Sequence, residues 1–487
     1  MRYRTDQLGN IIKGLSALCV AMVLGGLTAG AQVSDAWVGR WWLGMLEEAS
    51  LPLNITFEKE GNEATKPVLY SPMQSSEAIL PSDWSFSADT LRIQIKSLNA
   101  KLSLKYNSED TSFSGKFKQG LLVADIRFRR SEGMYKLIRP QMPHAPFPYR
   151  EKQYVLRHKD SRGEEIAVGV TLTLPGKDES SAKSPCVLLV SGSGMQNRDE
   201  ELLGHKPFWV IADHLARNGI ASLRYDDRGT GESSGDVANV TTDLLADDAE
   251  WLFDWLRRQP SINNRMVGIV GHSEGGTIGP MIASRNRKVA FVVMLAGPGV
   301  DGAELLRLQN RALFRASGVS DTLVEVRDRF LKGCFDITLR DDKANPDRLF
   351  SLFKALADSL SSNLGKSDRK KIGLTRYDAM QMSAQMSMPW MRRCIELNPG
   401  DYLKKLKCPV LAMNGERDLQ VPANENLAAI RALIAPKLLT AKEFEGLNHL
   451  FQHCDKGLPS EYMLIEETIA PEVLETMVGW ILGHFEL

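Results

Sequence analysis

Cysteine is scarce in this sequence, and neither sign of charge is in excess. Six cysteines occur among 487 residues, and none has the Cys-x-x-Cys spacing of a zinc site. Lysine plus arginine and aspartate plus glutamate both number 60, so the formal net charge is zero. Such a chain has no overall field to hold a nucleic acid backbone or an anionic membrane. We therefore expect no zinc site, no nucleic acid partner, and a small or uncharged partner.

A complete nucleotide-binding motif is also missing. The glycine-rich segment Ser-Gly-Ser-Gly at 191–194 is not completed by Gly-Lys-Ser/Thr or by Gly-x-Gly-x-x-Gly. Phosphate-binding loops need those additional residues to contact the phosphates. The sequence therefore predicts no nucleotide site and no cofactor.

The N-terminal segment has the features of an export signal. Basic residues occur at positions 2, 4 and 13, the run from Ile11 to Leu27 is otherwise uncharged, and Ala-Gly-Ala at 29–31 fits the small-x-small cleavage pattern. We predict a signal peptide over residues 1–31 and a periplasmic or extracellular protein, with no stable membrane span after cleavage. An uncleaved anchor is the alternative, because the apolar run approaches the roughly 20 residues that span a bilayer.

Signal cleavage would remove Cys19, leaving an odd number of cysteines in a compartment that permits disulfides. At most two disulfides can then form. A bridge between Cys334 and Cys394 is one expectation, and unpaired buried thiols are the other.

The length and the 43% hydrophobic composition predict a large core and two or three domains. Over residues 33–138, short runs such as Leu91–Ile95 and Leu102–Tyr106 alternate apolar and polar residues, which predicts antiparallel strands. We expect an all-β domain here, either a small sandwich or a partly closed barrel. Residues 139–150 are rich in proline and predict a stiff linker.

Residues 151–487 alternate short apolar strands with helices. This alternation requires crossover connections and predicts an α/β domain with a doubly wound, mostly parallel sheet. The predicted strands are Cys186–Val190, Ile220–Tyr225, Met266–Val270, Val289–Leu295, Val410–Asn414 and Ala441–Phe444. The predicted helices of this sheet are Phe208–Arg217, Asp243–Arg258, Glu274–Ser284, Ala423–Ile434 and Pro471–Phe485.

A helix-rich insertion interrupts the alternation over about 299–405. We expect helices at Leu305–Ala316, Thr322–Leu331, Pro346–Leu360 and Met380–Met391. An insertion between two strands of the sheet lies by topology over their carboxyl ends, where ligands bind, so it is a candidate lid. Its methionines would form either an acyl pocket or, as we expect for most of them, contacts between helices.

The strongest chemical motif is Gly-His-Ser-Glu-Gly-Gly at 271–276, between a predicted strand and a predicted helix. This is the context of a nucleophile elbow, where the serine adopts a strained backbone and small neighbours avoid a collision. The sequence therefore predicts Ser273 as a nucleophile. An ordinary glycine turn is the alternative interpretation.

A serine hydroxyl needs a base that a carboxylate orients, expected in the chain order serine, acid, histidine. Asp418, after the strand that resumes the sheet, is the predicted acid, with Glu416 as its rival. His449, in Gly-Leu-Asn-His after the next strand, is the predicted base, with His453 as the competitor.

A tetrahedral intermediate also needs two N–H donors for its oxyanion. Glu274, directly after the nucleophile, is one predicted donor. Ser193 in the glycine-rich segment is the other, with Gly194 as the alternative.

These motifs resemble the α/β-hydrolase superfamily over about 149–487. More narrowly, they resemble bacterial carboxylesterases with an extra N-terminal β-domain, which are similar to the prolyl-oligopeptidase and acetyl-xylan-esterase branches. The resemblance implies ester hydrolysis through an acyl-enzyme. Ser191 departs from it, since many relatives have histidine before the oxyanion glycine. The segment Arg224–Ser233 looks like a strand-end loop of this superfamily and is interpreted as structural.

We therefore expect an exported serine carboxylesterase acting on a small-molecule ester. A serine peptidase is the second hypothesis, although the N-terminal region is too short for a propeller. The third is a glycan-binding or partner-binding protein with an inert hydrolase core.

Overall fold

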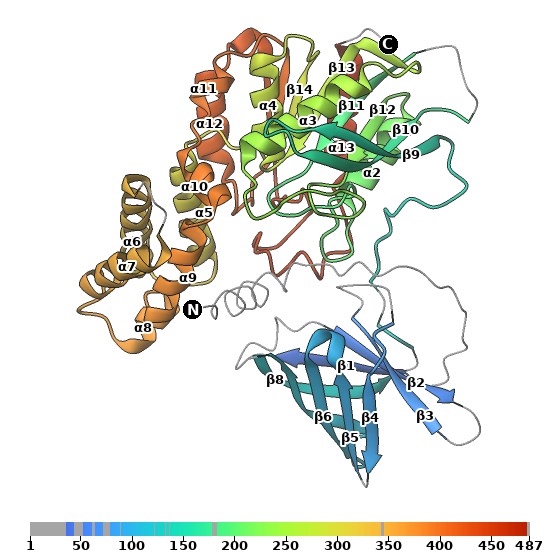
Figure 1. The fold of residues 1–487 in the computed structure, drawn as a ribbon, viewed down its shortest axis with the longest axis vertical. Coiled ribbons are helices and arrows are strands. Elements are labelled where there is room, and N and C mark those ends of the chain that lie inside the picture. The colour runs from blue at the N-terminus through green and yellow to red at the C-terminus, as the bar shows by residue number, and fades with distance from the viewer. Residues whose placement is uncertain are drawn as a thin grey trace. The chain divides into compact units, whose positions relative to one another are not determined.

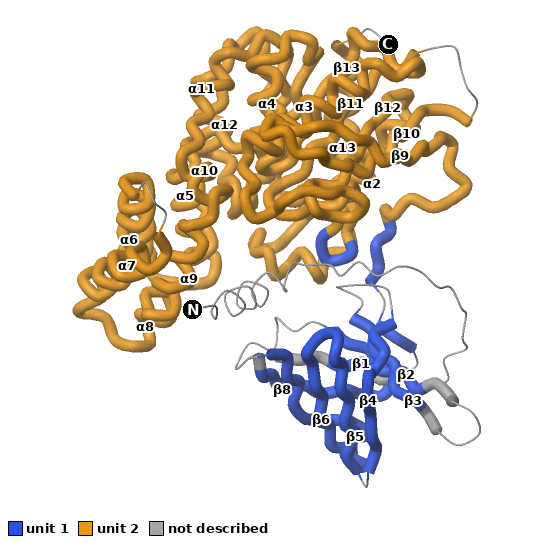
Figure 2. The backbone as a smooth tube through the Cα atoms, viewed as in Figure 1, with its two compact units in different colours: residues 1–140, 202–204 blue, residues 141–201, 205–487 orange. Residues whose placement is uncertain are grey.

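A computed structural model describes most of the chain and places it in two compact units. The described residues are 36–42, 52–60, 64–71, 78–87, 89–120, 122–131, 133–135, 137–177, 183–341 and 345–484. The predicted signal peptide lies outside them. Unit 1 comprises residues 1–140 and 202–204, and unit 2 comprises residues 141–201 and 205–487 (Figure 2).

Unit 1 is a single antiparallel sheet of eight strands that curls around an apolar core (Figure 1). Its strands are β1 (Ala36–Trp42), β2 (Pro52–Glu60), β3 (Ala64–Tyr70), β4 (Asp83–Ser87), β5 (Thr90–Ile95), β6 (Ala100–Asn107), β7 (Ser112–Gln119) and β8 (Leu122–Ser131). The order is β3-β2-β1-β8-β7-β6-β5-β4. Leu69 of β3 and Ile79, just before β4, exchange two backbone hydrogen bonds (3.2 and 2.7 Å) and so join the two ends of the sheet. Of the two predicted architectures, unit 1 is the partly closed barrel.

Unit 2 contains a second eight-stranded sheet, which is mostly parallel. Its strands are β9 (Arg150–Lys159), β10 (Glu165–Leu174), β11 (Ser184–Val190), β12 (Ala221–Tyr225), β13 (Ile262–His272), β14 (Val292–Leu295), β15 (Val410–Gly415) and β16 (Leu439–Phe444). The order is β16-β15-β14-β13-β11-β12-β10-β9, and only β9 and β10 run antiparallel to their neighbours. All six predicted strands are present.

Helices cover both faces of this sheet. Successive residues of β11 alternate between two apolar cores, Leu188 facing one and Val187 the other, as the period-two geometry of a strand requires. The first core is completed by α3 (Thr242–Leu256), α4 (Gly275–Arg285) and α12 (Ala423–Leu433), and the second by α2 (Pro207–Arg217) and α13 (Pro471–Gly483). The predicted doubly wound α/β domain is therefore confirmed.

A helical insert lies between β14 and β15 and has its own apolar core. Its helices are α5 (Gly302–Ala316), α6 (Asp321–Arg340), α7 (Pro346–Leu360), α8 (Lys366–Lys371), α9 (Arg376–Met386), α10 (Pro389–Glu396) and α11 (Gly400–Leu403). The predicted helix 380–391 is wrong as a single element, because Pro389 has no N–H to continue α9 and instead begins α10. Met382 and Met386 are buried in the insert core, whereas Met380 and Met388 are exposed.

The thiols of the described residues are unpaired. Free cysteines are Cys186, Cys334, Cys394, Cys408 and Cys454. The expected bridge between Cys334 and Cys394 is therefore absent, and Cys334 instead fills the apolar core of the insert. None of the helices in the described part of the chain has the length and hydrophobicity that crossing a bilayer requires.

Candidate active site

Ser273 occupies a sharp turn between β13 and α4. Its φ of +52° lies in the left-handed region, which is strained for a residue with a Cβ. Its backbone N–H donates to the carbonyl of Leu295 at the end of β14 (2.8 Å), which fixes the turn against the neighbouring strand. The side chain is held at the carboxyl end of the sheet, at the amino terminus of α4.

The glycines around Ser273 allow the strand and helix to approach closely. A Cβ on Gly271 would lie 1.9 Å from the carbonyl oxygen of Gly275, and one on Gly275 would lie 2.0 Å from that of Val190. Neither distance is compatible with a side chain, so the elbow requires glycine at both positions. This is the physical reason for the Gly-x-Ser-x-Gly pattern in this chain.

The structure joins His449 to Asp418. The two side chains are 5% and 0% exposed, and the Nδ1 of His449 lies 2.8 Å from Oδ2 of Asp418. Because a carboxylate only accepts, Nδ1 carries the proton and Nε2 is left as the basic nitrogen. Oδ1 of Asp418 accepts from the backbone N–H groups of Gln420 and Val421, both at 2.8 Å, so the carboxylate is fixed in position.

The rival acid and base lie elsewhere. Oε2 of Glu416 accepts from the backbone N–H of Gly446 (2.8 Å), and His453 is exposed and contacts Glu467 and Glu472. Neither takes part in the Asp418–His449 pair. The described contacts do not include a direct hydrogen bond between Ser273 and His449, which in ligand-free sites is often long.

His272, the residue before the nucleophile, connects the elbow to the predicted base. Its Nε2 lies 3.1 Å from the carbonyl oxygen of His449, and its Nδ1 lies 2.8 Å from Oε1 of Glu200. The two imidazole rings are 4.8 Å apart between centroids. The residue next to the nucleophile therefore binds the backbone carbonyl of His449 and so holds the predicted base near Ser273.

The glycine-rich loop after β11 lies against the nucleophile. A Cβ on Gly192 would be 3.2 Å from the Cβ of Ser273, so the loop backbone passes directly beside that side chain. The N–H of Gly192 donates to Oε1 of Glu200 (2.7 Å) and is thereby occupied. Among the described residues, the N–H groups of Ser193 and Glu274 have no acceptor, which leaves both of the predicted oxyanion donors available.

The strand-end loop after β12 holds the glycine-rich loop in place. Oδ2 of Asp227 accepts from the hydroxyl of Ser191 (2.9 Å) and from the N–H of Gln196 (3.1 Å), and Asp226 binds the guanidinium and the N–H of Arg198. Burial raises the pKa of Asp227 well above its ordinary value. Ser191, the residue that departs from the family pattern, therefore anchors the loop through its hydroxyl.

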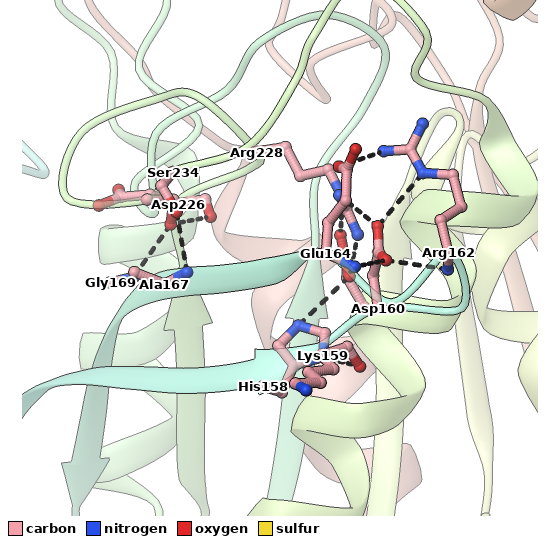
Figure 3. Close-up of polar contacts among 12 residues, drawn as sticks. His158, Lys159, Asp160, Arg162, Glu164, Ala167, Gly169, Asp226, Arg228 and Ser234 are labelled. Carbon is pink, nitrogen blue, oxygen red and sulfur yellow. Dashed lines mark hydrogen bonds and ion pairs between the residues drawn. The ribbon is translucent and has the colours of Figure 1, made fainter.

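Further along the same strand-end loop, Arg228 is part of a buried ion-pair network. Its Nη1 lies 3.0 Å from Oδ2 of Asp160, and it also pairs with Asp248 of α3. Figure 3 shows the Asp160 carboxylate bound by both Arg228 and Arg162. These contacts tie the antiparallel edge of the sheet to the helical layer, which supports a structural role for this part of the loop.

The Glu274 side chain links the elbow to the insert. Its Oε1 accepts from the hydroxyl of Thr242 (2.6 Å) and from the indole N–H of Trp390 in α10 (2.9 Å). The side chain is 8% exposed. Burial raises the pKa of Glu274, against the lowering effect of side-chain hydrogen bonds from Thr242, Trp390 and Ser193. The residue predicted to donate to the oxyanion thus also contacts the helical insert.

The sequence did not reveal Glu200 or Asp227 as parts of the site. Glu200 lies in the run Asn-Arg-Asp-Glu-Glu at 197–201, where no pattern distinguishes one acid from another. Asp227 falls in a loop interpreted as structural. A positive φ at Glu200 (+51°) turns its side chain toward the elbow, and local sequence gives no signal for such a conformation.

A nucleophile elbow at the carboxyl end of a central strand of a doubly wound sheet, with a histidine–aspartate pair, makes this chain a member of the α/β-hydrolase superfamily. The family within it follows from sequence comparison. Residues 163–455 match the model of the X-Pro dipeptidyl-peptidase (S15) family, and the chain belongs to that family.

Two relatives each match about two thirds of this chain. The esterase EstD of Thermotoga maritima is 27% identical over 315 residues, which are 63% of this chain and 65% of the esterase. The chain thus spans about two thirds of the length of that relative. A 31.7 kDa uncharacterized protein of Escherichia coli, from the traX-finO intergenic region, is 23% identical over 67% of this chain and 98% of its own length.

Solved structures match at lower sequence identity. The α/β hydrolase GrgF from Penicillium matches with a TM-score of 0.41 and 15% identity, over 70% of this chain and all of its own. Est1E from Butyrivibrio proteoclasticus, solved with ferulic acid, matches with a TM-score of 0.40 and 16% identity, over 68% of this chain and all of its own.

Proposed function

We propose that this protein is an exported serine carboxylesterase with Ser273, His449 and Asp418 as its catalytic residues. The observation that supports this most is the buried hydrogen bond between His449 and Asp418, held beside a serine on a strained elbow. A relative named as an esterase supports the same class of substrate.

The first half of the proposed reaction acylates the enzyme. Nε2 of His449 takes the hydroxyl proton as Oγ of Ser273 attacks the ester carbonyl, and Asp418 stabilises the imidazolium that forms. The N–H groups of Ser193 and Glu274 would bind the oxyanion. Collapse of the intermediate breaks the bond to the alcohol, which leaves with the proton from His449, and the acyl group stays on Ser273.

The second half releases the acid. Water replaces the alcohol, gives one proton to His449, and attacks the acyl-enzyme through the same oxyanion site. The acid leaves as Ser273 regains its proton. No cofactor is required for either half, because the nucleophile, base and oxyanion donors all come from this chain.

We further propose that the helical insert acts as a lid. Trp390 of α10 contacts Glu274 next to the nucleophile, and Arg393 of the same helix pairs with Asp243 at the start of α3. Replacing Trp390 with Phe keeps the ring but removes the N–H, so we expect a changed preference for acyl length on an ester panel. An unchanged preference would argue against this role.

Turnover of short-chain aryl esters tests the catalytic proposal. We expect Ser273→Ala to lose activity by at least about 10³-fold, because the remaining groups provide only the residual catalysis of a site without its nucleophile. A fluorophosphonate probe should label the parent protein and not Ser273→Ala, which also excludes an inert core. Full activity in Ser273→Ala would refute the proposal.

A dipeptidyl peptidase is the second candidate, and the match to the S15 family favours it. The same triad cleaves amides when the leaving amine is protonated by the histidine. Matched chromogenic substrates, an X-Pro amide and an ester of the same acyl group, separate the two. For each substrate, kcat/KM is divided by the rate of uncatalysed hydrolysis. We expect this ratio to be much higher for the ester than for the amide, and the opposite ranking would favour the peptidase.

A further inference from the structure

Two loops and the end of a strand meet at the side chains of Glu200 and His272. Glu200 belongs to the loop after β11, His272 ends β13, and His449 belongs to the loop after β16. Oε1 of Glu200 accepts from the N–H of Gly192 (2.7 Å) and contacts Nδ1 of His272 (2.8 Å), while Nε2 of His272 reaches the carbonyl of His449 (3.1 Å). Both side chains are buried, so these contacts are shielded from water.

The chemistry of the partners fixes where protons lie. A carbonyl oxygen only accepts, so Nε2 of His272 carries a proton. Nδ1 faces a carboxylate oxygen that already accepts from Gly192, so a proton must also lie between Nδ1 and Glu200. Burial alone would favour the neutral imidazole, but the carboxylate of Glu200 outweighs it and raises the pKa of His272. The contacts and the raised pKa both favour an imidazolium paired with a carboxylate.

Other ionisable groups face this pair from the surrounding loops. They are Asp227 after β12, Asp418 after β15 and His449 after β16. Asp418 is hydrogen-bonded to His449, and Asp227 is buried and bound by Ser191. Glu200 is the group in direct contact with the His272 imidazole, so it supplies the neutralising charge.

We propose that Glu200 and His272 are a positioning pair. The pair fixes the positions of His449 and of the glycine-rich loop after β11 relative to Ser273 at the same time. The proposal rests on the proposed catalytic role of that serine. Oε1 of Glu200 holds the glycine-rich loop through the N–H of Gly192. The His272 imidazolium bound to the same oxygen holds the backbone carbonyl of His449.

The pair works only while the imidazolium keeps both protons. As the pH rises through the pKa of His272, Nδ1 loses its proton and its lone pair faces the carboxylate of Glu200, so the contact becomes repulsive. We expect kcat to fall on this alkaline limb with little change in KM, because geometry at the reacting atoms is lost and substrate binding is not.

Two variants separate the components of the pair. His272→Gln keeps a side-chain N–H donor for the carbonyl of His449 but cannot titrate, so the alkaline limb of the kcat profile should disappear. Glu200→Gln removes the neutralising charge, so the alkaline limb should move to lower pH and kcat should fall about 10- to 100-fold, the range expected when reacting groups are displaced.

Matched controls come from the same chain. His205 is also buried and contacts the carbonyl of Tyr462 (3.0 Å) and the hydroxyl of Thr468 (3.0 Å). Glu201 is the exposed neighbour of Glu200. His205→Gln and Glu201→Gln should leave the alkaline limb where it is in the parent protein, whatever they do to thermal stability.

Nitrogen-15 NMR of histidine-labelled protein decides the protonation state without relying on activity. Both imidazole nitrogens of His272 should be protonated at pH 7, and a neutral ring there would overturn the proposal. So would parent-like pH profiles in folded His272→Gln and Glu200→Gln. If the parent protein neither turns over esters nor reacts with a fluorophosphonate, the proposed function fails, while the NMR result still decides the pair.

Discussion

At the scale of single residues, the two oxygens of Asp418 have separate tasks. Oδ1 accepts from two backbone N–H groups and shapes its own loop. Oδ2 faces Nδ1 of His449 (2.8 Å) and also accepts from Nδ2 of Asn414 (3.3 Å). In Asp418→Asn the amide nitrogen can take the place of Oδ2 and present a donor to the imidazole. The histidine then adopts the wrong tautomer, with its proton on the nitrogen that must act as base.

We therefore expect Asp418→Asn to fold normally and to lose about 10⁴-fold in kcat, by analogy with the serine-protease aspartate. Esterase kinetics and circular dichroism measure the two parts. Glu416→Gln is the control, since its carboxylate binds a backbone N–H outside the triad, and its kcat should stay within a few-fold of the parent value. Equal losses in the two variants would contradict the assignment of the acid.

Glu274 gives a prediction about stability and pH. Its pKa in the folded protein is raised above the ordinary value of 4.5 by burial. A group with a raised folded pKa binds its proton more tightly when folded, so its contribution to stability is lost as the pH rises from 4.5 through the folded pKa. Glutamine is neutral throughout and keeps an oxygen for the donors of Thr242 and Trp390.

The Tm of Glu274→Gln minus that of the parent should therefore grow between pH 4.5 and pH 8. Thermal unfolding at a series of pH values measures this difference. Glu201→Gln, at an exposed position, should show no such trend. A Tm difference that stays constant with pH would mean that burial does not disfavour the ionised form of Glu274.

At the scale of elements, the parallel strands and the helices that cover them are the elements that the sequence could predict. Each is apolar on a regular period, and each is bounded by a turn. The β9–β10 hairpin was missed, because β9 places charged side chains between half-buried ones and follows directly on a proline-rich segment. The two-loop contact between Glu200 and His272 was not predictable either, since it depends on tertiary geometry.

The packing predicts opposite effects of alanine at two glycines, Gly275 of the elbow and Gly479 of α13. A Cβ at position 275 would lie 2.0 Å from the carbonyl oxygen of Val190, whereas a Cβ at Gly479, exposed in α13, would meet nothing within 4 Å. We expect Gly275→Ala to cost more than about 3 kcal/mol, because backbone and not a flexible side chain would have to move. Gly479→Ala should stabilise the helix by roughly 0.5–1 kcal/mol.

Denaturant unfolding of both variants against the parent protein measures this contrast. Similar stabilities for the two variants would show that β11 and α4 can separate without cost. That outcome would remove the physical reason for glycine at the elbow.

At the scale of the whole molecule, the chain divides after Pro140, within the proline-rich segment. Gln141, on the other side of that division, receives hydrogen bonds from the N–H groups of Thr468 (2.6 Å) and Ile469 (3.0 Å) and so packs within unit 2. The proposed triad, the proposed oxyanion donors and the Glu200–His272 pair all lie in unit 2. Each unit also has an apolar core of its own.

These facts predict that a fragment beginning at Gly133 folds and keeps its esterase kcat/KM within a few-fold of the full chain. The fragment starts there because Nη2 of Arg139 donates to the carbonyl of Leu203 (2.9 Å), three residues beyond Glu200. A fragment beginning at Gln141 lacks that bond and should lose more activity, through the loop that carries Glu200. Kinetics of both fragments and calorimetry of the full chain, where unit 1 should add a separate transition, test the prediction. A Gly133 fragment that is folded but inactive would assign the barrel a part in catalysis.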